Sequence, residues 1–367
     1  MKLLMISGDR SILAGKRGAF WYTLEEMSKH WERIDIICPH VAGEHPSIPF
    51  KNIFFHVSPW SLPRQPWWIL QKGSELIAEH HHDVTTVHEY PPFYNGRGAM
   101  WLSRAMGMPF VLEVHHVVGY PKAASLSEWI GYQLSRFVLP REARHAAAVR
   151  CVSQEGSEVL QSFGISPDKL HIIPSFYLDH TLLTPNHSIT KTHDVVCAAR
   201  LVANKGLSEL LMAIAKIPAA RLLLIGDGPL RQKLEGQAKA FGITDRVTFT
   251  GWLPSQEDVI KAMQRGKIFV MNSRSEGGPR SSLEAMALGL PVLSTRVGIM
   301  QEVIDDGKNG MFTTGEAGDV AGKLEKLLSD ESLRTKLGHE ARKVLDRFER
   351  KKLIGEYAEF LKKVASK

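Results

Sequence analysis

A strand, a loop and a helix follow one another in residues 268–287, IFVMNSRSEGGPRSSLEAMA. The apolar run at its start predicts a short buried strand, and residues 281–288 favour a helix. Glu276 then lies in the loop, and Glu284 lies about one turn inside the helix. Free N–H groups at the helix start form an anion site between the two carboxylates. A carboxylate can accept hydrogen bonds from sugar or ribose hydroxyls while the amides hold a diphosphate, as a nucleotide-sugar site requires. Glutamates at a helix start are also common because they suit the helix macrodipole. Other parts of the chain are needed to choose between these two interpretations.

Short apolar runs recur along the chain, separated by segments long enough for a helix. Strands that alternate with helices predict an α/β fold with parallel sheets covered on both faces. The stretch 174–193 interrupts this pattern and indicates a linker between two domains, residues 1–178 and residues 190–345. A last helix is expected at about 350–367. The predicted strands are 3–6, 34–38, 53–57, 84–87, 110–114, 147–152, 171–173, 195–199, 221–225, 247–249, 268–271, 292–294 and 311–313.

The composition is that of an ordinary globular protein of two domains: 367 residues, 44% hydrophobic and 23% charged. No apolar run approaches the roughly 18 residues needed to cross a bilayer. Cys38, Cys151 and Cys197 each lie in or beside an apolar stretch. Buried free thiols in a reducing compartment are expected, which places the protein in the cytoplasm. The net charge of +7 includes no basic run interleaved with aromatic residues, so nucleic acid is not an expected partner.

Polar residues follow several of the predicted strands, and ligands of open parallel sheets bind beyond the carboxyl ends of the strands. His115 follows the strand 110–114, and Arg200 follows the strand 195–199. Lys205 comes five residues later, just before a helix. An arginine fork and a lysine point charge at this spacing are suited to gripping a diphosphate. Loop cations are often merely solvated, but beside the Glu276 loop we favour the diphosphate grip.

Other short motifs carry weaker signals. Gly18, in the first strand-to-helix crossover, would let a phosphate approach the following helix, although a plain turn explains it nearly as well. The run 226–228, GDG, lacks the third glycine of a dinucleotide site. The histidines at 80–82 are expected to fan outward at a surface helix end rather than to bind metal. No D-x-D pair occurs, which removes the usual grip for a divalent ion on a sugar diphosphate.

Taken together, these stretches resemble the retaining GT-B glycosyltransferases of family GT4, also called glycosyltransferase group 1. The first half of the chain matches this family more loosely than the second half does, through residues 83–88 and the strand end at His115. The resemblance implies two facing Rossmann-like domains with parallel sheets and a C-terminal helix that returns to the first domain. Five motifs occur in the family's order: Arg200 to Gly206, GDGP at 226–229, VTFTG at 247–251, Glu276 to Glu284, and GLPV at 289–292 followed by EVI at 302–304.

The resemblance also implies roles for individual residues. Arg200 and Lys205 would bind the donor diphosphate, and Glu284 would bind the ribose hydroxyls. Glu276 would contact the donor sugar near its reacting carbon, and His115 would position the sugar or the leaving group. The other implied donor-binding residues are Arg280 and Ser281 through their amides, Leu253 beside the base, and Gly277, Gly278 and Gly18.

Three departures from the family pattern stand out. Arg17-Gly18 replaces the family's Gly-Gly, residues 173–179 form a linker one residue longer than usual, and His115-His116 replaces His-Asp or His-Gly. The first of these puts the phosphate approach at Gly18 in doubt.

The expected activity is therefore a retaining transfer of a sugar from a UDP- or GDP-sugar donor to a hydroxyl of a glycan or glycolipid acceptor. No metal and no cofactor beyond the donor is expected. Such a reaction belongs to glycan, glycolipid or polysaccharide biosynthesis. A nucleotide-sugar epimerase on a GT-B scaffold is the alternative, and a noncatalytic sugar-binding protein is a third reading.

The stretch 60–70, WSLPRQPWWIL, holds three tryptophans and one arginine. Tryptophan prefers the interface between headgroups and hydrocarbon, so the stretch suggests a peripheral contact with the inner face of the cell membrane. Large aromatic side chains suit a protein core equally well. Both interpretations remain open from the sequence, with the core slightly favoured.

Overall fold

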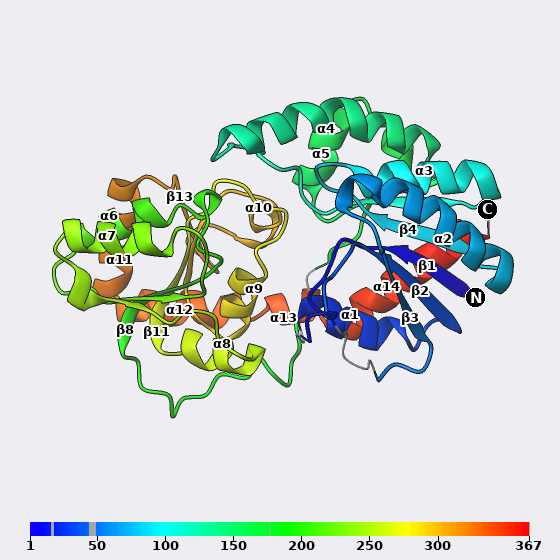
Figure 1. The fold of residues 1–367 in the computed structure, drawn as a ribbon. Helices are drawn as coiled ribbons and strands as arrows, with labels where there is room; N and C mark the ends of the chain where they lie inside the picture. Colours follow the sequence, from blue (N-terminus) through cyan, green and yellow to red (C-terminus); the bar gives the residue numbers. More distant parts are fainter. Residues whose placement is uncertain (16–17, 44–48, 176, 367) are drawn as a thin grey trace. The chain divides into compact units, whose positions relative to one another are not determined.

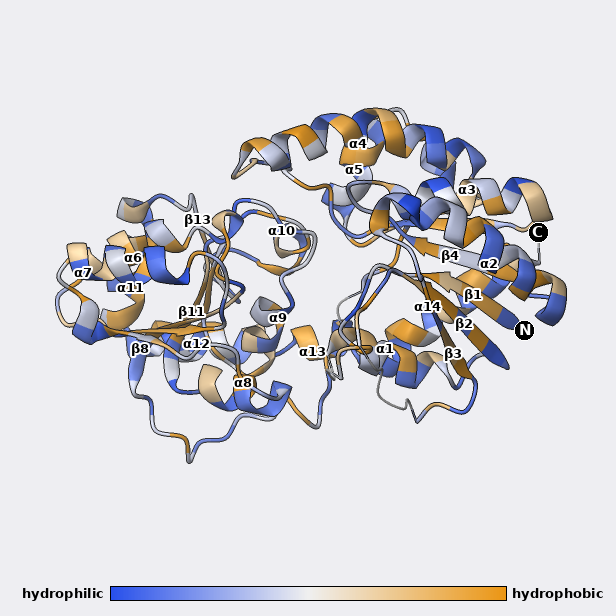
Figure 2. Ribbon diagram, in the orientation of Figure 1, coloured by the Kyte–Doolittle hydropathy of each residue, from blue (hydrophilic) through white to orange (hydrophobic). Residues whose placement is uncertain are grey.

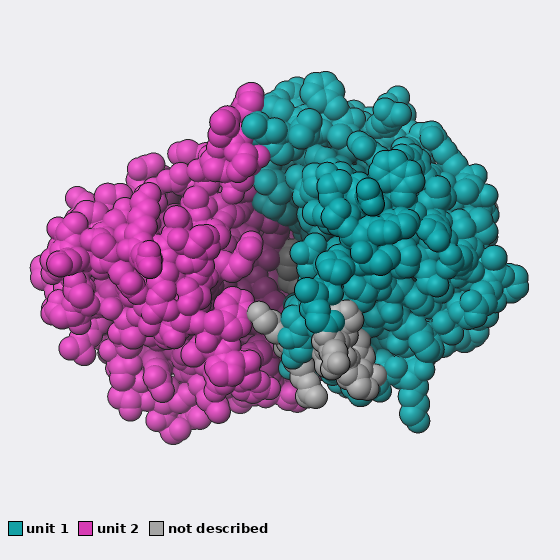
Figure 3. Space-filling model, in the orientation of Figure 1, with its two compact units in different colours: residues 1–118, 130–175, 351–367 teal, residues 119–129, 176–350 magenta. Residues whose placement is uncertain are grey.

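The computed structural model describes residues 1–15, 18–43, 49–175 and 177–366. Its contacts divide the chain into two compact units, which Figure 3 colours separately. The segment 119–129 groups with the second unit, although the predicted first domain ran without a break to residue 178. The first unit comprises Met1–Val118, Ile130–Ser175 and Lys351–Lys367, and the second comprises Gly119–Trp129 and Phe176–Arg350.

A seven-stranded parallel sheet forms the centre of the first unit, in the order β3-β2-β1-β4-β5-β6-β7 (Figure 1). The inner strands are buried along almost their whole length, as apolar runs in a sheet covered on both faces must be. Leu4 of β1 aligns with Asp35 on one side and with Thr85 on the other. The strands are β1 (Lys2–Ile6), β2 (Arg33–Cys38), β3 (Ile53–Val57), β4 (Val84–His88), β5 (Phe110–Val114), β6 (Ala148–Cys151) and β7 (Leu170–Ile172).

Helices cover both faces of this sheet (Figure 1). Two of them, α2 and α3, approach so closely that a Cβ on Gly73 would lie 2.5 Å from Leu102 and a Cβ on Gly98 would lie 2.8 Å from Ile69. Glycine at both positions therefore permits the contact. The helices are α1 (Ala19–Met27), α2 (Gln65–His80), α3 (Tyr94–Met106), α4 (Leu126–His145), α5 (Gln154–Ser162) and α14 (Arg350–Ala365), with short 3₁₀ turns at Leu62–Arg64 and Pro167–Lys169.

The last helix, α14, packs in the first unit, as the family resemblance implied. It buries Leu353, Ile354, Tyr357, Ala358 and Leu361. Residues three and four apart share one face of a helix, so this set forms a continuous apolar stripe.

A six-stranded parallel sheet in the order β10-β9-β8-β11-β12-β13 forms the second unit. Its core is made of aliphatic side chains from the strands and from α6 and α11, with Leu210, Leu222 and Ile268 fully buried. Each predicted strand of both sheets is found within two residues of its expected bounds. The strands are β8 (His193–Ala198), β9 (Leu222–Ile225), β10 (Val247–Phe249), β11 (Gly266–Met271), β12 (Val292–Thr295) and β13 (Met311–Thr313).

The helices of the second unit lie on the two faces of its sheet, with α6, α7 and α11 on one and α8, α9 and α12 on the other (Figure 1). The chain enters and leaves this unit side by side, because Leu178 N donates to Phe348 O at 2.8 Å. The helices are α6 (Leu207–Lys216), α7 (Arg231–Ala240), α8 (Gln256–Met263), α9 (Arg280–Ala287), α10 (Met300–Val303), α11 (Ala317–Ser329), α12 (Glu331–Ala341) and α13 (Val344–Arg347), with 3₁₀ turns at Ala203–Lys205 and Thr244–Arg246.

The sequence predicted that the chain has no membrane-spanning segment and that its cysteines are buried free thiols. Among the described residues, no helix combines the length and the apolar character that a membrane span requires. The three cysteines are buried and form no disulfide.

Candidate functional site

The loop that carries Glu276 is fixed by hydrogen bonds to two neighbouring loops. It begins after β11 and ends where α9 starts. Asn272 Nδ2 donates to the carbonyl oxygens of Gly206 and Gly315, each at 3.0 Å. Arg274 N donates to Asn204 O at 2.7 Å, which joins the loop to the 3₁₀ turn that contains Lys205. The segments that carry Glu276 and Lys205 are therefore held against each other by hydrogen bonds.

Lys205 and Glu276 form an ion pair, in which Lys205 Nζ contacts Glu276 Oε1. Both side chains are mostly removed from solvent. Gly206 follows with φ +58°, and a Cβ there would lie 2.1 Å from Asn272 O. Only glycine allows the backbones to come this close. The two segments predicted to bind the diphosphate and the sugar thus meet directly.

Arg200 lies on the loop that follows β8, as predicted, and its side chain is exposed. Within the described part of the chain, the Arg200 guanidinium pairs with no carboxylate. Lys205, by contrast, is already neutralised by Glu276. Arg200 is thus the uncommitted cation on this strand-end loop.

Glu284 is buried one turn inside α9 and is held by two donors. Gln256 Nε2 donates to Glu284 Oε1 at 2.6 Å, and Arg280 Nε donates to the same oxygen at 2.9 Å. Both bonds end on Oε1, which leaves Oε2 to accept from a ligand. The sequence had predicted Glu284 and the Arg280 amide but not Gln256, which lies 28 residues earlier on α8.

The start of α9 has no side-chain cap, and its cap position is Pro279. The first N–H groups of any α-helix lack partners within the helix, so the Arg280 and Ser281 amides are available to an anion. Gly277 in the preceding loop accepts a hydrogen bond from Ile299 N at 3.0 Å. Gly278 and Leu253 are partly exposed.

In the first unit, His115 belongs to a cluster centred on Glu113. His115 Nε2 lies 3.0 Å from Glu113 Oε2, and His88 Nε2 lies 3.4 Å from the same oxygen. The two imidazole nitrogens are 3.1 Å apart. Burial, followed by the charge of His88, lowers the pKa of His115 to about 4. His115 is therefore neutral at pH 7 and can donate through only one ring nitrogen.

The buried Glu113 carboxylate is surrounded by donors. Arg150 Nη1 donates to Oε2 at 2.8 Å, and the hydroxyls of Thr86 and Tyr357 donate to Oε1. Burial would raise the pKa of Glu113, but the Arg150 charge and the hydrogen bond from His115 outweigh it and hold the pKa well below the usual range. Glu113 is thus a fixed negative charge beneath the two histidines.

The ligand atoms of His88, Glu113 and His115 lie within 4.8 Å of one another, close enough to surround a metal ion. Arg150 already neutralises Glu113, so this cluster is better suited to orienting imidazoles than to holding a cation. Gly18 is the cap residue of α1 and is half-buried. Arg17, which stands where the family has the first glycine of its Gly-Gly, lies outside the described residues.

One expectation about the histidines at 80–82 was wrong. The chain turns at His81, which has φ 54°, and this turn sends His82 inward. His82 Nε2 lies 2.8 Å from the fully buried Asp35, which also contacts His56 and Arg33. The helix α2 does end at His80, as expected, but the hydrogen bond with buried Asp35 explains the inward position of His82.

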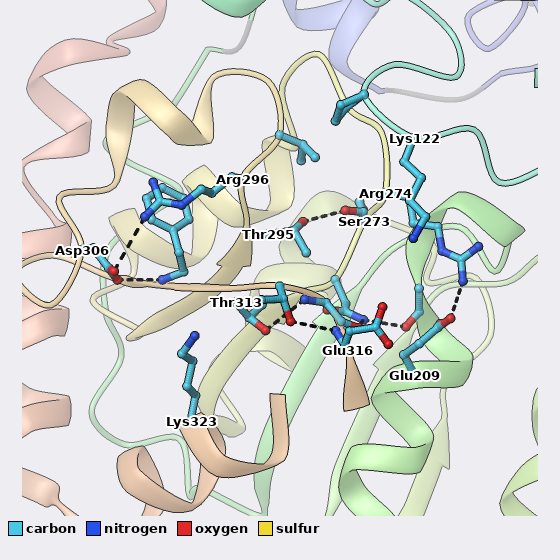
Figure 4. Close-up of a pocket in the computed structure, with 17 residues that line it drawn as sticks. Lys122, Glu209, Ser273, Arg274, Thr295, Arg296, Asp306, Thr313, Glu316 and Lys323 are labelled. Atoms are coloured by element: carbon cyan, nitrogen blue, oxygen red, sulfur yellow. Dashed lines mark hydrogen bonds and ion pairs between the residues drawn. The ribbon is translucent and has the colours of Figure 1, made fainter. Parts of the chain in front are cut away.

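The second unit also contains a pocket of about 380 Å³ at the carboxyl ends of β11, β12 and β13 (Figure 4). Ser273 and Thr295 are joined across it by a 2.6 Å hydrogen bond. Neither the Lys205–Glu276 pair nor Glu284 lines this pocket. The loops that carry those residues combine an anion-binding helix start with paired charges, so the candidate site is placed there. The charged residues that line the pocket are Lys122, Glu209, Arg274, Arg296, Asp306, Glu316 and Lys323.

The second unit therefore brings together Lys205 with Glu276 and Arg280 with Glu284, while His115 and Gly18 belong to the first. Sequence reasoning missed Glu113, His88, Arg150 and Gln256. The position of His88 at the carboxyl end of a strand could have indicated that it belongs to the cluster around His115. Glu113 lies only two residues before His115, whereas Arg150 and Gln256 reach their carboxylates across 37 and 28 residues of chain.

The architecture, two Rossmann-like units with parallel sheets, is the GT-B fold. The family model described as "Glycosyl transferases group 1" matches residues 183–344, and the model described as "Glycosyltransferase Family 4" matches residues 19–177. The chain belongs to this family of group 1, or GT4, glycosyltransferases.

Relatives and solved structures agree with this assignment. The chain is 36% identical over 171 residues to the lipopolysaccharide core biosynthesis glycosyltransferase LpsE of Rhizobium meliloti, which covers 46% of this chain and 49% of that protein. The chain spans about half the length of the curated relatives it matches.

Two solved structures share the fold over nearly the whole chain. Sucrose-phosphate synthase from Thermosynechococcus elongatus superposes with a TM-score of 0.85 at 18% identity, over 100% of this chain and 99% of that one. Anabaena HepE in complex with UDP-glucose superposes with a TM-score of 0.78 at 21% identity, over 99% and 100%. At these identities the likeness concerns the fold alone.

Proposed function

We propose that this chain is a glycosyltransferase that moves a sugar from a nucleotide-diphosphate donor to a hydroxyl group of a glycan or glycolipid. The observation that carries the proposal is the Lys205–Glu276 ion pair beside the uncapped start of α9. A cation, a sugar-facing carboxylate and free amides are the parts that a sugar diphosphate requires. Membership of the GT4 family supports the same reaction class.

The geometry suggests how the donor is held. A diphosphate that reaches the α9 amides competes with Glu276 for Lys205, and Arg200 adds a second cation. Glu276 is then released to accept hydrogen bonds from the sugar hydroxyls. Glu284 Oε2 accepts from the ribose while Gln256 and Arg280 fix Oε1. The fixed charges stabilise the negative charge that develops on the leaving phosphate.

Transfer in this scheme proceeds without a metal ion, because Arg200, Lys205 and the amides neutralise the diphosphate. The test is the rate of transfer in excess EDTA. Persistence of the activity supports the proposal. Complete loss, restored by Mg²⁺ or Mn²⁺, contradicts it.

We also propose that the sugar keeps its anomeric configuration, with neutral His115 positioning the donor sugar or the leaving group. NMR of the product formed from an α-linked donor tests this proposal. An α-linked product is expected, and a β-linked product contradicts it.

A UDP-sugar is the donor we propose, and GDP-sugars are the competing class. The complex of HepE with UDP-glucose supports UDP at the level of the shared fold. A thermal-shift panel of UDP-, GDP- and ADP-sugars tests the choice. A donor at about 100 times its Kd should stabilise the protein by roughly 2.7 kcal/mol. A shift with GDP-sugars alone would reverse the assignment.

The acceptor class and the cellular location are part of the same proposal. LpsE is named for lipopolysaccharide core biosynthesis, which supports a glycan or glycolipid acceptor here. The buried thiols without a disulfide are consistent with a cytoplasmic site. An epimerase is not favoured, because the relatives are transferases, and donor incubated without acceptor gives the control. Unchanged donor by NMR is expected, whereas an epimerised sugar would support the alternative.

A further inference from the structure

The helix α4 exposes a row of large apolar side chains. Leu126, Trp129, Ile130, Leu134 and Phe137 are between 45% and 75% exposed. Their spacing of three and four residues places them on one side of the helix. Single exposed apolar residues are common on protein surfaces, but a contiguous set marks an interaction site.

This row is not the face by which α4 packs on the protein. The helix buries Gly131, Ser135, Leu139, Glu142 and Ala143, which lie on the opposite side. Figure 2 shows apolar segments recurring along the whole length of α4. The helix therefore has a covered side that includes polar residues and a separate exposed side that is apolar.

The exposed charges of α4 all have the same sign. Arg136, Arg141 and Arg144 are exposed beside or in line with the apolar row. The acidic residues of the helix are Glu128, which accepts a hydrogen bond from Ala124 N at 2.7 Å, and the buried Glu142. A partner of this surface should therefore be apolar at its centre and negatively charged around it.

We infer that α4 is a lipid-binding helix that lies on the surface of an anionic bilayer. Trp129 and Phe137 would enter the layer between headgroups and hydrocarbon, and the arginines would meet lipid phosphates. A second copy of the chain fits less well, because it would bring a second set of arginines to the same interface. The inference does not depend on sugar transfer, since lipid binding is measured without substrate.

The tryptophan stretch at 60–70, expected from the sequence to be either core or membrane contact, is a weaker candidate. Trp60 and Trp68 pack edge to face with centroids 5.9 Å apart and are half-buried. Of the three tryptophans in this stretch, only Trp67 is well exposed, at 56%, and it contacts Trp101. This stretch supplies a matched control for α4.

Flotation with phosphatidylglycerol-containing and with pure phosphatidylcholine vesicles tests the inference at low and high salt. Wild type should float with the anionic vesicles at low salt, and less at high salt. Trp129→Ala/Phe137→Ala should reduce partitioning at least about tenfold. Arg136→Gln, Arg141→Gln and Arg144→Gln should each reduce it about fivefold. Trp67→Ala should bind like wild type, and circular dichroism of each variant excludes misfolding.

Three results would overturn the inference. Wild type that stays unbound on anionic vesicles at low salt is the first. The second is a Trp129→Ala/Phe137→Ala variant that folds normally and floats as well as wild type. The third is a wild type that is dimeric by light scattering while the double variant is monomeric, because the apolar row would then join two copies of the chain.

Discussion

A buried carboxylate lies at the centre of two polar clusters in this protein, one around Glu284 and one around Glu113. Glu284 is fixed by Gln256 and Arg280, and Glu113 is fixed by Arg150 and hydroxyl donors. A carboxylate removed from water is tolerated only when such partners surround it. The clusters differ in how the oxygens are used: the bonds from Gln256 and Arg280 both end on Glu284 Oε1, whereas Glu113 uses both oxygens within the protein.

Replacing the cations of the diphosphate grip tests the donor site directly. We expect Arg200→Ala and Lys205→Ala each to lower kcat/KM by a transition-state cost of about 2–4 kcal/mol, because charge on the leaving phosphate loses its partner. Lys267→Ala is the control, since Lys267 pairs with Asp194 on the surface of the same unit. Steady-state kinetics with the identified donor provide the measurement. Unchanged kcat/KM in both site variants would rule the grip out.

The pKa of His115 should depend on its neighbour His88. The charge of His88 contributes to the low pKa of His115, so His88→Asn should raise that pKa from about 4 toward the ordinary value. NMR titration of labelled histidines would follow the change. His339→Asn, an exposed position in the second unit, should leave it unaltered. If the pH midpoint of the His115 titration is the same in His88→Asn as in wild type, the charge of His88 does not contribute to the pKa of His115.

At the scale of elements, the site is made by short loops that touch backbone to backbone. Gly206 meets Asn272, and Gly298, with φ +52°, would place a Cβ 2.2 Å from Gly277 O. These contacts lock the loops after β8, β11 and β12 against one another. The side chains of Lys205 and Glu276 are oriented as a consequence.

Alanine in place of Gly206 should therefore damage both stability and the site. The positive φ and the approach to Asn272 O together should cost about 1–3 kcal/mol. Gly236→Ala is the matched control, because Gly236 lies inside α7 and a Cβ added there would meet no atom within 4 Å. That variant should gain about 0.5–1 kcal/mol. Chemical denaturation compares the two, and equal effects would refute the packing argument.

A pair of buried carboxylates between α3 and α4 should make stability depend on pH. Burial, followed by the charge of Glu89, raises the pKa of Glu142, and burial also raises the pKa of Glu89. The folded state therefore binds more protons than the unfolded state above pH 4.5, and stability falls as pH rises toward the raised pKa values.

Glu142→Gln should remove part of this pH dependence. We expect the Tm of this variant to fall less between pH 6 and pH 9 than the Tm of wild type. At pH 9 the difference in the free energy of unfolding should be on the order of 1–3 kcal/mol. Exposed Glu158→Gln on α5 serves as the control. Parallel Tm curves for Glu142→Gln and wild type would contradict the assignment.

How much of the fold and of the candidate site could be predicted from the sequence depends on which interactions are local. The strands were predicted correctly because buried parallel strands carry continuous apolar runs. Glu276, Glu284 and Lys205 could be proposed as site residues because they fall in ordered motifs. Gln256 and Tyr357 were not, since they reach their carboxylates across 28 and 244 residues of chain. Contacts of that kind depend on the folded topology and leave no local pattern.

At the scale of the whole molecule, each unit has its own sheet and core, yet the chain ends in the unit where it began. The helix α14 follows the second unit in sequence but buries its apolar stripe in the first. Tyr357 extends this packing into the polar cluster, where its hydroxyl donates to Glu113 and its ring lies 3.8 Å beneath the Arg150 guanidinium. The last helix is thus a structural part of the first unit.

Removing the Tyr357 hydroxyl should therefore weaken one unit and spare the other. In Tyr357→Phe, Glu113 loses a buried donor while the ring remains beneath the Arg150 guanidinium, so the first unit should lose about 1–3 kcal/mol. Hydrogen exchange should accelerate at amides of β4 and β5, whose strands carry Thr86 and Glu113. Amides of β8 and β11 act as the internal control and should exchange as in wild type. If they accelerate equally, the two units unfold together, and the independence of their cores is refuted.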